Sequence, residues 1–404
     1  MTNVPEIRFK GFTDAWEQRR LGDALSEKIS NGIMNRPGRN SLNVRHINVV
    51  NLYTPSKIQP NELSYFDATE KDLQKCNVEV DDIFLTRSSL KLEGIAQANI
   101  LLDDGDYVFD DHIMRIKLTS EFEPFFVKEA LNHSLTKKDF MTKAKTGTMT
   151  TIGQDDITSS GITFPIKTEQ THIGQFFRAL DNTLAIYKRK LDGLRELKKA
   201  YLQQMFPQSG ETVPRLWFEG FRRDWEVNKL GDVANFNPRS TLPNTFEYVD
   251  LESVVGTSLV SHRTESKETA PSRAQRLARR GDVFFQMVRP YQMNNYLFDL
   301  TFDNYVFSTG YAQLRPNIHS YFLLCRLQEK CFVAKVLDRC TGTSYPAINS
   351  TDLAEIEISV TLDDNEQKAI GTFFRNLDTQ IETQSKKIEK LKLLKSAYLQ
   401  KMFV

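Results

Sequence analysis

The sequence predicts an α+β protein in which two globular domains are separated by two long helices that pair as an antiparallel coiled coil. The two halves are predicted to be related by pseudo-two-fold symmetry. Three observations lead to this prediction: a long amphipathic helix pattern occurs twice, an aromatic motif precedes each globular stretch, and each stretch contains apolar runs of strand length. Self-similarity on the scale of half a chain indicates a duplicated domain rather than a solenoid.

Length and composition agree with a soluble, multidomain protein. The chain has 404 residues, which favours two or more domains over a single core. Its formal net charge is +1, so any binding of nucleic acid must come from local basic patches. No apolar run is long enough to cross a bilayer, and the first residues lack the apolar segment of a signal peptide. We therefore expect a cytoplasmic location and no membrane partner.

The four cysteines show no C-x-x-C spacing and are predicted to be reduced thiols. A zinc site built from His319 with Cys325, Cys331 and Cys340 is the alternative, but the spacing of these residues is poor. No metal site is therefore predicted.

The first element is the aromatic motif. Residues 5–23, PEIRFKGFTDAWEQRRLGD, return as residues 214–232, PRLWFEGFRRDWEVNKLGD, with nine identities over nineteen ungapped positions. Trp16 and Trp225 occupy equivalent positions in the two copies. We expect both indoles to pack under a helix, and stacking on DNA bases is the alternative.

The stretches that follow the motif differ more between the halves. Asp82-Ile-Phe-Leu and Asp282-Val-Phe-Phe are predicted to be equivalent buried strands that follow an acidic turn. Tyr107-Val-Phe and Tyr305-Val-Phe are predicted to be a second equivalent pair. Each stretch then contains a Thr-Gly-Thr loop, at residues 146–148 and 341–343. One scaffold with two divergent surfaces favours recognition of two different things by the same geometry.

The two long helices are predicted at Glu169–Phe206 and Glu366–Phe403. At about 1.5 Å per residue, each would be roughly 55 Å long. Apolar residues in steps of three and four form the predicted helix–helix seam. These residues are Ile173, Phe177, Leu180, Leu184, Leu191 and Leu194 in the first helix, and Ile370, Phe374, Leu377, Ile381, Ile388 and Leu391 in the second. A coiled coil that only dimerises the protein is the alternative to intramolecular pairing.

Three polar or small positions interrupt the helix pattern. Gln384 falls on the second seam, opposite the register of Tyr187, and is predicted to fix the pairing register. Gly174 and Gly371 lie in the first turns, where glycine costs about 1 kcal/mol relative to alanine. Their recurrence indicates a close backbone approach or a hinge, and a tolerated defect is the alternative. The predicted divisions of the chain are 1–165 (domain), 166–212 (helix and linker), 213–362 (domain) and 363–404 (helix).

The order of motifs resembles the specificity subunit of type I restriction-modification systems. The resemblance rests on F-x-G-F-x-x-x-W-E-x-x-x-L-G-D, which occurs twice, on I-G-x-F-F-R-x-L-D at both helix starts, and on A-Y-L-Q-x-M-F at both helix ends. It covers essentially the whole chain. It implies a non-catalytic DNA reader, in which each domain is a target recognition domain for one half of a bipartite sequence. The helices would set the spacing and dock methyltransferase subunits.

The same resemblance implies the partners and cofactors. The partners are double-stranded DNA with a bipartite target, two adenine methyltransferase subunits and two restriction or translocase subunits. A methyltransferase-only system would lack the restriction subunits. No cofactor is expected in this chain, because S-adenosylmethionine, ATP and Mg would belong to the partner subunits. The outer helix faces, with Lys188, Arg189, Lys198, Lys386 and Lys390, are expected to meet those subunits.

Candidate DNA-binding residues are those able to contact phosphates or base edges. They cluster after predicted strands and in the Thr-Gly-Thr loops. In the first domain they are Arg36, Arg39, Arg45, Arg87, Ser88, Lys91, Lys145, Thr146 and Thr148. In the second they are Arg263, Lys267, Arg273, Gln286, Arg289, Tyr291, Asn294, Thr341 and Thr343. For each residue taken alone, a solvated surface side chain is an equally good interpretation.

The sequence lacks the motifs of the enzyme classes that could act on DNA or hydrolyse ATP, esters or peptides. There is no G-x-x-x-x-G-K-[ST] loop, no Asn/Asp-Pro-Pro-aromatic tetrapeptide, no G-x-S-x-G and no H-E-x-x-H. We therefore predict no catalytic residues. The competing hypotheses are an unrecognised nuclease or methyltransferase, and a coiled-coil adaptor that does not bind DNA.

Overall fold

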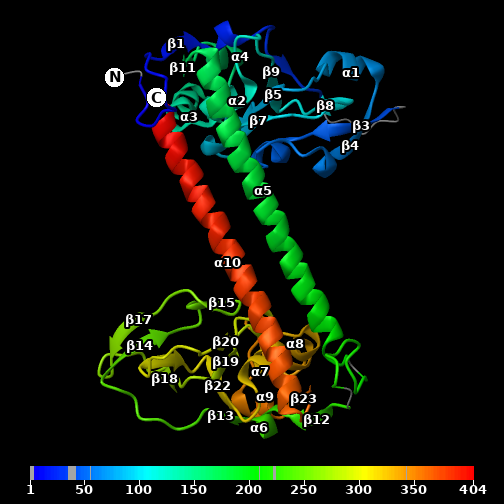
Figure 1. The fold of residues 1–404 in the computed structure, drawn as a ribbon, viewed down its shortest axis with the longest axis vertical. Helices are drawn as coiled ribbons and strands as arrows, with labels where there is room; N and C mark the ends of the chain where they lie inside the picture. Colours follow the sequence, from blue (N-terminus) through cyan, green and yellow to red (C-terminus); the bar gives the residue numbers. More distant parts are fainter. Residues whose placement is uncertain (1–3, 35–41, 55, 209, 222–223, 343) are drawn as a thin grey trace. The chain divides into compact units, whose positions relative to one another are not determined.

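The computed structural model describes residues 4–34, 42–54, 56–208, 210–221, 224–342 and 344–404 (Figure 1). The chain divides into two compact units. Unit 1 comprises Met1–Lys190 and Gln384–Val404, and unit 2 comprises Leu191–Thr383. Both long helices contribute residues to both units. The domain boundaries given above follow sequence similarity rather than contacts, and they stay a prediction.

Unit 1 contains a four-stranded antiparallel sheet, a three-stranded mixed sheet and two short ladders (Figure 1). The four-stranded sheet has the order β2 (Ser30–Asn31), β9 (Ile113–Ile116), β5 (Ile83–Thr86), β7 (Ala98–Ile100). The three-stranded sheet has the order β4 (Ser64–Ala68), β3 (Leu42–Ile47), β8 (Tyr107–Phe109), with β3 and β8 parallel. The ladders join β1 (Glu17–Arg20) to β11 (Gly161–Phe164) and β6 (Ser88–Ser89) to β10 (Thr150–Thr151). The helices of this unit before the long helix are α1 (Glu70–Cys76), α2 (Pro124–Asn132), α3 (Ser134–Lys143) and α4 (Gln154–Thr158), with 3-10 turns at Leu21–Ala24, Val49–Tyr53, Pro60–Glu62 and Leu92–Gly94.

Unit 2 repeats this plan. Its first sheet has the order β13 (Ala234–Phe236), β22 (Tyr311–Pro316), β19 (Val283–Gln286), β20 (Tyr296–Leu297). Its second has the order β17 (Arg263–Ser266), β14 (Thr245–Val249), β21 (Tyr305–Ser308), β18 (Ala274–Leu277). The ladders join β12 (Glu226–Lys229) to β23 (Glu357–Val360) and β15 (Val254–Val255) to β16 (Ser258–Leu259). The helices are α6 (Leu230–Val233), α7 (Ser320–Leu327), α8 (Lys330–Leu337) and α9 (Ser350–Ala354), with a 3-10 turn at Pro290–Gln292.

The strand orders confirm the duplicated α+β fold. Both predicted strand pairs occupy equivalent places. β5 and β19 are fully buried central strands, and β8 and β21 pair in parallel with the equivalent strands β3 and β14. The halves differ beside the second pair. Unit 2 adds β18 along β21, whereas in unit 1 helix α1 contacts β8. The described helices include none long and apolar enough to span a membrane.

The long helices are α5 (Lys167–Gln204) and α10 (Asp364–Met402), drawn in green and red in Figure 1. Within unit 1, the Phe176 ring lies 5.0 Å from the Tyr398 ring, and Gln384 Nε2 donates to the Tyr187 carbonyl at 3.1 Å. Within unit 2, Lys198 Nζ lies 2.6 Å from Asp378 Oδ1, and the rings of Tyr201 and Phe373 are 4.9 Å apart. In each unit the numbers rise on α5 as they fall on α10. The predicted antiparallel pairing is therefore confirmed, and Gln384 meets the residue predicted for it.

The predicted seam is buried along most of its length. Buried members are Ile173, Phe177, Leu184, Leu191, Ile370, Phe374, Leu377 and Ile388. Half-buried members are Leu180, Leu194, Ile381 and Leu391. The first apolar residues of each helix do more than pair helices, because Ile173 and Phe177 belong to the core of unit 1 and Ile370 and Phe374 to the core of unit 2.

Each tryptophan of the repeated motif closes one of these cores. Trp16 is 2% exposed and packs edge-on against Phe126 and Phe403, which follows the last turn of α10. Trp225 is also 2% exposed and packs edge-on against Phe206, which follows the last turn of α5. Packing under a helix end is therefore confirmed, and indoles buried to this degree do not stack on DNA bases.

The two helix-start glycines provide close approach. A Cβ atom on Gly174 would lie 2.1 Å from Glu123 Oε2, and one on Gly371 would lie 2.4 Å from the His319 ring. Glu123 and His319 cap α2 and α7, respectively, by accepting hydrogen bonds from backbone N–H groups. The glycines let each long helix lie against the cap of the helix that it crosses.

Replacing Gly371 with alanine is expected to destabilise the protein by about 1–3 kcal/mol. The new methyl group would displace the His319 cap, and a lost cap and a crowded contact together outweigh the gain in helix propensity. Gly193 of α5 is the matched control, since nothing lies within 4 Å of its Cβ position. Gly193→Ala is expected to stabilise by up to about 1 kcal/mol in urea denaturation of the full chain. Equal effects of the two substitutions would contradict the close-approach interpretation.

Candidate nucleic-acid interface

Two loops meet at the end of the central strand in both units. In unit 1, β6 pairs with β10 directly after β5, and Ile152 N donates to Arg87 O at 3.0 Å. In unit 2, Val288 bridges Ala347 directly after β19, and Ile348 N donates to Met287 O at 3.1 Å. We call residues 87–94 with 145–151 the unit 1 loop cluster, and residues 287–294 with 341–342 and 344–347 the unit 2 loop cluster. The unit 1 loop cluster includes the Thr-Gly-Thr loop of that half, and the unit 2 loop cluster includes Thr341 and Gly342.

The unit 1 loop cluster brings together most of the candidates predicted for that half. These are Arg87, Lys91, Lys145, Thr146 and Thr148, all exposed, and Ser88, which is buried. Ser88 Oγ lies 2.5 Å from His112 Nδ1 instead of facing solvent. Arg36 and Arg39 lie outside the described residues.

Arg45 lies elsewhere in unit 1, on β3 of the three-stranded sheet. Its guanidinium donates to Tyr107 Oη at 3.1 Å and lies 3.3 Å from Asp103 Oδ2. The hydrogen bond to Tyr107 raises the pKa of Arg45. The charge of Arg45 is therefore engaged within the unit, away from the unit 1 loop cluster.

The unit 2 loop cluster contains Arg289, Tyr291, Asn294 and Thr341, whereas Thr343 lies outside the described residues. The Arg289 guanidinium lies 4.3 Å from the centre of the Tyr345 ring, a cation–π contact, and Tyr345 is 62% exposed. The backbone of Arg289 also has a left-handed conformation, with φ 55°, which residues other than glycine rarely adopt. Strained backbone of this kind is often found at functional sites.

Gln286 was predicted to contact DNA, and the structure places it in the interior, 2% exposed. Its Nε2 donates to Val288 O at 2.6 Å and to Gln292 Oε1 at 2.9 Å. On the far side of the loop, Gln328 Nε2 donates to Met293 O at 3.0 Å. The prediction of a direct contact is wrong in this structure, because a glutamine at the end of a buried central strand faces the core. Gln286 instead anchors the loop that presents Arg289.

Three other candidates of unit 2 belong to the other sheet. Arg263 lies on β17, and Lys267 and Arg273 lie between β17 and β18, where both are exposed. Arg263 pairs with Glu265 and Asp250, each at 2.7 Å, and the hydrogen bond to Glu265 is the main cause of its raised pKa. The basic run in the sequence is therefore partly neutralised by acidic neighbours.

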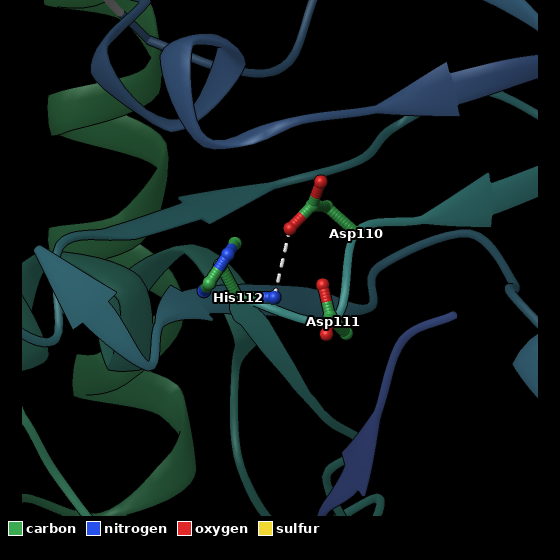
Figure 2. Close-up of side chains that lie close together, drawn as sticks. All are labelled: Asp110, Asp111 and His112. Atoms are coloured by element: carbon green, nitrogen blue, oxygen red, sulfur yellow. Dashed lines mark hydrogen bonds between the residues drawn. The ribbon is translucent and has the colours of Figure 1, made fainter. Parts of the chain in front are cut away.

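Figure 2 shows Asp110, Asp111 and His112, whose possible metal-ligand atoms all lie within 4.8 Å of one another. His112 N donates to Asp110 Oδ1 at 2.8 Å, so a tight turn between β8 and β9 explains the grouping. The four cysteines are free thiols. The His319 side chain caps α7. Among the residues that the structure describes, it forms no potential metal-binding group with a cysteine.

A pocket of about 550 Å³ lies beside the unit 1 loop cluster and was not predicted. Its walls include Val49, Tyr53, Ser88, Leu90, His112 and Met149. These residues come from segments far apart in sequence, and most are apolar residues of the kind that a sequence pattern places in a core. Leu90, Tyr53 and His112 are exposed whereas Ser88 is buried, so no single sequence signal marks the pocket.

The chain matches a family model described as "Type I restriction modification DNA specificity domain" over residues 13–196 and 222–393. The chain belongs to this family. The two matched segments correspond to the two copies of the fold. Family membership confirms the prediction of a DNA specificity protein rather than an enzyme.

Two curated relatives carry matching descriptions. A putative type I restriction enzyme MjaX specificity subunit of Methanocaldococcus jannaschii is 24% identical over 243 residues, which is 58% of this chain and 56% of the relative. The type I restriction enzyme HindI specificity subunit of Haemophilus influenzae is 24% identical over 191 residues, or 45% of this chain and 41% of the relative. The chain thus spans about half the length of the curated relatives that it matches.

A solved structure shares the fold along the whole chain. It is the S subunit of a type I restriction-modification system from M. genitalium, with a TM-score of 0.64 and 16% identity. The alignment covers 99% of both chains. At this identity the likeness concerns the fold alone, and it agrees with the duplicated α+β architecture.

Proposed function

We propose that this chain is the DNA-recognition subunit of a type I restriction-modification complex, and that each unit reads one half of a bipartite target. One observation carries the proposal. Both units place a loop cluster at the end of the same central strand, yet the clusters differ in chemistry. Unit 1 presents Arg87, Lys91 and Lys145 beside an apolar pocket, whereas unit 2 presents Arg289 on an aromatic ring. Equal scaffolds with unlike loops suit the reading of two unlike half-sites.

We further propose that α5 and α10 set the spacing between the half-sites and dock two adenine methyltransferase subunits, with two restriction or translocase subunits joining the complex. S-adenosylmethionine, ATP and Mg would be bound by those subunits. Lys198 drops out of the predicted docking set, because it is 20% exposed and bonded to Asp378. Lys188, Arg189 and Lys390 are exposed, as such a role requires.

Exchanging residues 24–165 for the equivalent segment of a relative tests the bipartite reading. One half of the methylated sequence is expected to change while the other half stays as it was. The readout is the genome-wide methylation motif in cells with the parent and with the chimaeric gene. A change in both halves would contradict the assignment of one half-site to each unit, and a coiled-coil adaptor without DNA binding predicts no change in either.

Inserting four residues into both long helices tests the spacer role. The insertion adds about 6 Å to each helix, which corresponds to about two base pairs of duplex. The distance between half-sites is expected to grow while both half-sites are kept. A matched insertion into the 207–213 linker leaves both helices unchanged and is expected to keep the parental spacing. An altered half-site in the helix variant would argue against a spacer.

A further inference from the structure

The geometry of the pocket beside the unit 1 loop cluster points to a base-reading site that accepts the major-groove edge of a thymine. The inference rests on the proposed function and adds the ligand of one site to it. The apolar walls would receive the C5-methyl group, and the His112 ring would donate a hydrogen bond to O4.

The apolar side chains of the walls suit a methyl group, and the two charged side chains that also line the pocket, Lys91 and Glu93, are exposed to solvent. Leu90 follows β6 and is 83% exposed, and Tyr53, from the turn after β3, is 50% exposed. Tyr53 Oη donates to Gly94 O at 3.2 Å, so the hydroxyl is bonded within the unit and the ring is held at the pocket. Met149 adds a flexible apolar side chain from the Thr-Gly-Thr loop. Exposed apolar side chains gathered in a hollow indicate a binding surface.

His112 supplies the polar contact. Its Nδ1 lies 2.5 Å from Ser88 Oγ, so Nε2 is the ring nitrogen left for a ligand. When the Ser88 hydroxyl donates to Nδ1, Nε2 carries the proton and acts as a donor. In the major groove thymine alone presents an acceptor together with a methyl group, whereas cytosine presents an amino donor. A donor beside an apolar wall therefore selects thymine and disfavours cytosine.

The neighbouring charges place DNA at this pocket. Lys91 lines the pocket together with Glu93, and Arg87 and Lys145 are exposed in the same unit 1 loop cluster. None of these three basic residues forms an ion pair with another described residue in this structure. Phosphate contacts of this type position a duplex without reading it, and the pocket between them provides a base contact.

Replacing each thymine of the unit 1 half-site by uracil tests the inference, because only the methyl group is removed. The assembled complex is measured on duplexes carrying the target found by methylation mapping. At one thymine position, replacement by uracil is expected to lower the affinity of the complex for the duplex about four-fold, which is the value of one buried methyl group. Leu90→Ala is expected to reduce that loss to below two-fold. Leu135→Ala, an exposed leucine on α3 outside the pocket, is expected to keep the four-fold loss.

A second variant tests the histidine separately. His112→Phe keeps a ring and removes both nitrogens, so the preference for thymine over cytosine at that position is expected to fall by about ten-fold. Two results would overturn the pocket assignment and leave the bipartite reading intact. One is a unit 1 half-site that contains no thymine, and the other is a four-fold loss on uracil replacement that stays four-fold in Leu90→Ala. Absence of sequence-specific binding to any bipartite target would overturn the proposed function itself.

Discussion

Lys395→Met is expected to lower the stability of unit 1 by about 3–5 kcal/mol, because it leaves two buried carboxylates, Asp181 and Glu129, to share the one remaining lysine, Lys128. Lys395 Nζ lies 2.7 Å from Asp181 Oδ1 and 3.2 Å from Glu129 Oε1. Lys128 Nζ lies 2.5 Å from Glu129 Oε1 and completes a neutral group of two lysines and two carboxylates. Burial alone would raise the pKa of Glu129, but the lysines outweigh it and hold that pKa below its usual value.

Urea denaturation of the full chain measures this effect, with Lys401→Met as the control. Lys401 pairs with Glu6 at 3.3 Å, and both side chains are more than half exposed, so its loss is expected to cost less than about 1 kcal/mol. The pH dependence has a definite sign. In Lys395→Met the lowering of the Glu129 pKa by Lys395 is lost. The deficit is therefore present at neutral pH, where Glu129 is charged, and shrinks as the pH falls and Glu129 becomes protonated. A deficit that is independent of pH would indicate lost packing rather than lost charge pairing.

The long helices show what a sequence pattern predicts well. Their repeated three–four spacing predicted α5 and α10 to within two residues at each end. The buried charge group was not predicted, because Lys128 and Glu129 lie on α2, far in sequence from Asp181 and Lys395. Charged residues on a helix usually face water, and only the crossing of three elements reveals that these do not. Lys198 was misplaced on an outer face for the same reason.

Arg289→Lys is expected to weaken binding to the specific target about 30-fold, while binding to unrelated duplex DNA changes less than two-fold. Lysine keeps the charge but loses the planar fork that contacts two atoms of a guanine edge. The stack on Tyr345 and the hydrogen bonds from Gln286 and Gln328 anchor the loop that carries Arg289. Competition binding at fixed salt, with specific and unrelated duplexes, measures both values.

Arg280 provides the control for this prediction. It precedes the first residue of β19, whereas Arg289 follows the last one. Its side chain is exposed and pairs with Asp299 at 3.0 Å. Arg280→Lys is expected to leave both affinities within two-fold. Equal losses on specific and unrelated DNA after Arg289→Lys would make Arg289 a phosphate contact rather than a base contact.

The candidate interface was only partly predictable. Arg87, Lys91 and Lys145 could be named as candidates because basic residues after a strand and in a repeated loop are local signals; the structure brings them into one loop cluster, and their contact with DNA stays a prediction. Gln286 failed because residue type does not show which way a side chain points at the end of a buried strand. The pocket was missed since Tyr53, Leu90 and His112 become neighbours only when β5, β6 and the β8–β9 turn are in place.

Phe206 belongs to the core of unit 2 and Phe403 to the core of unit 1, and this affects the order in which the two cores are completed during translation. The core of unit 2 contains Phe206, which is synthesised before residues 214–383 of the same unit. The core of unit 1 contains Met402 and Phe403, which are synthesised after all the residues of unit 2. The nascent first half must therefore remain unfinished, with the Trp16 side of its core uncovered, until the second half has been synthesised. In this chain the half that begins first is closed last.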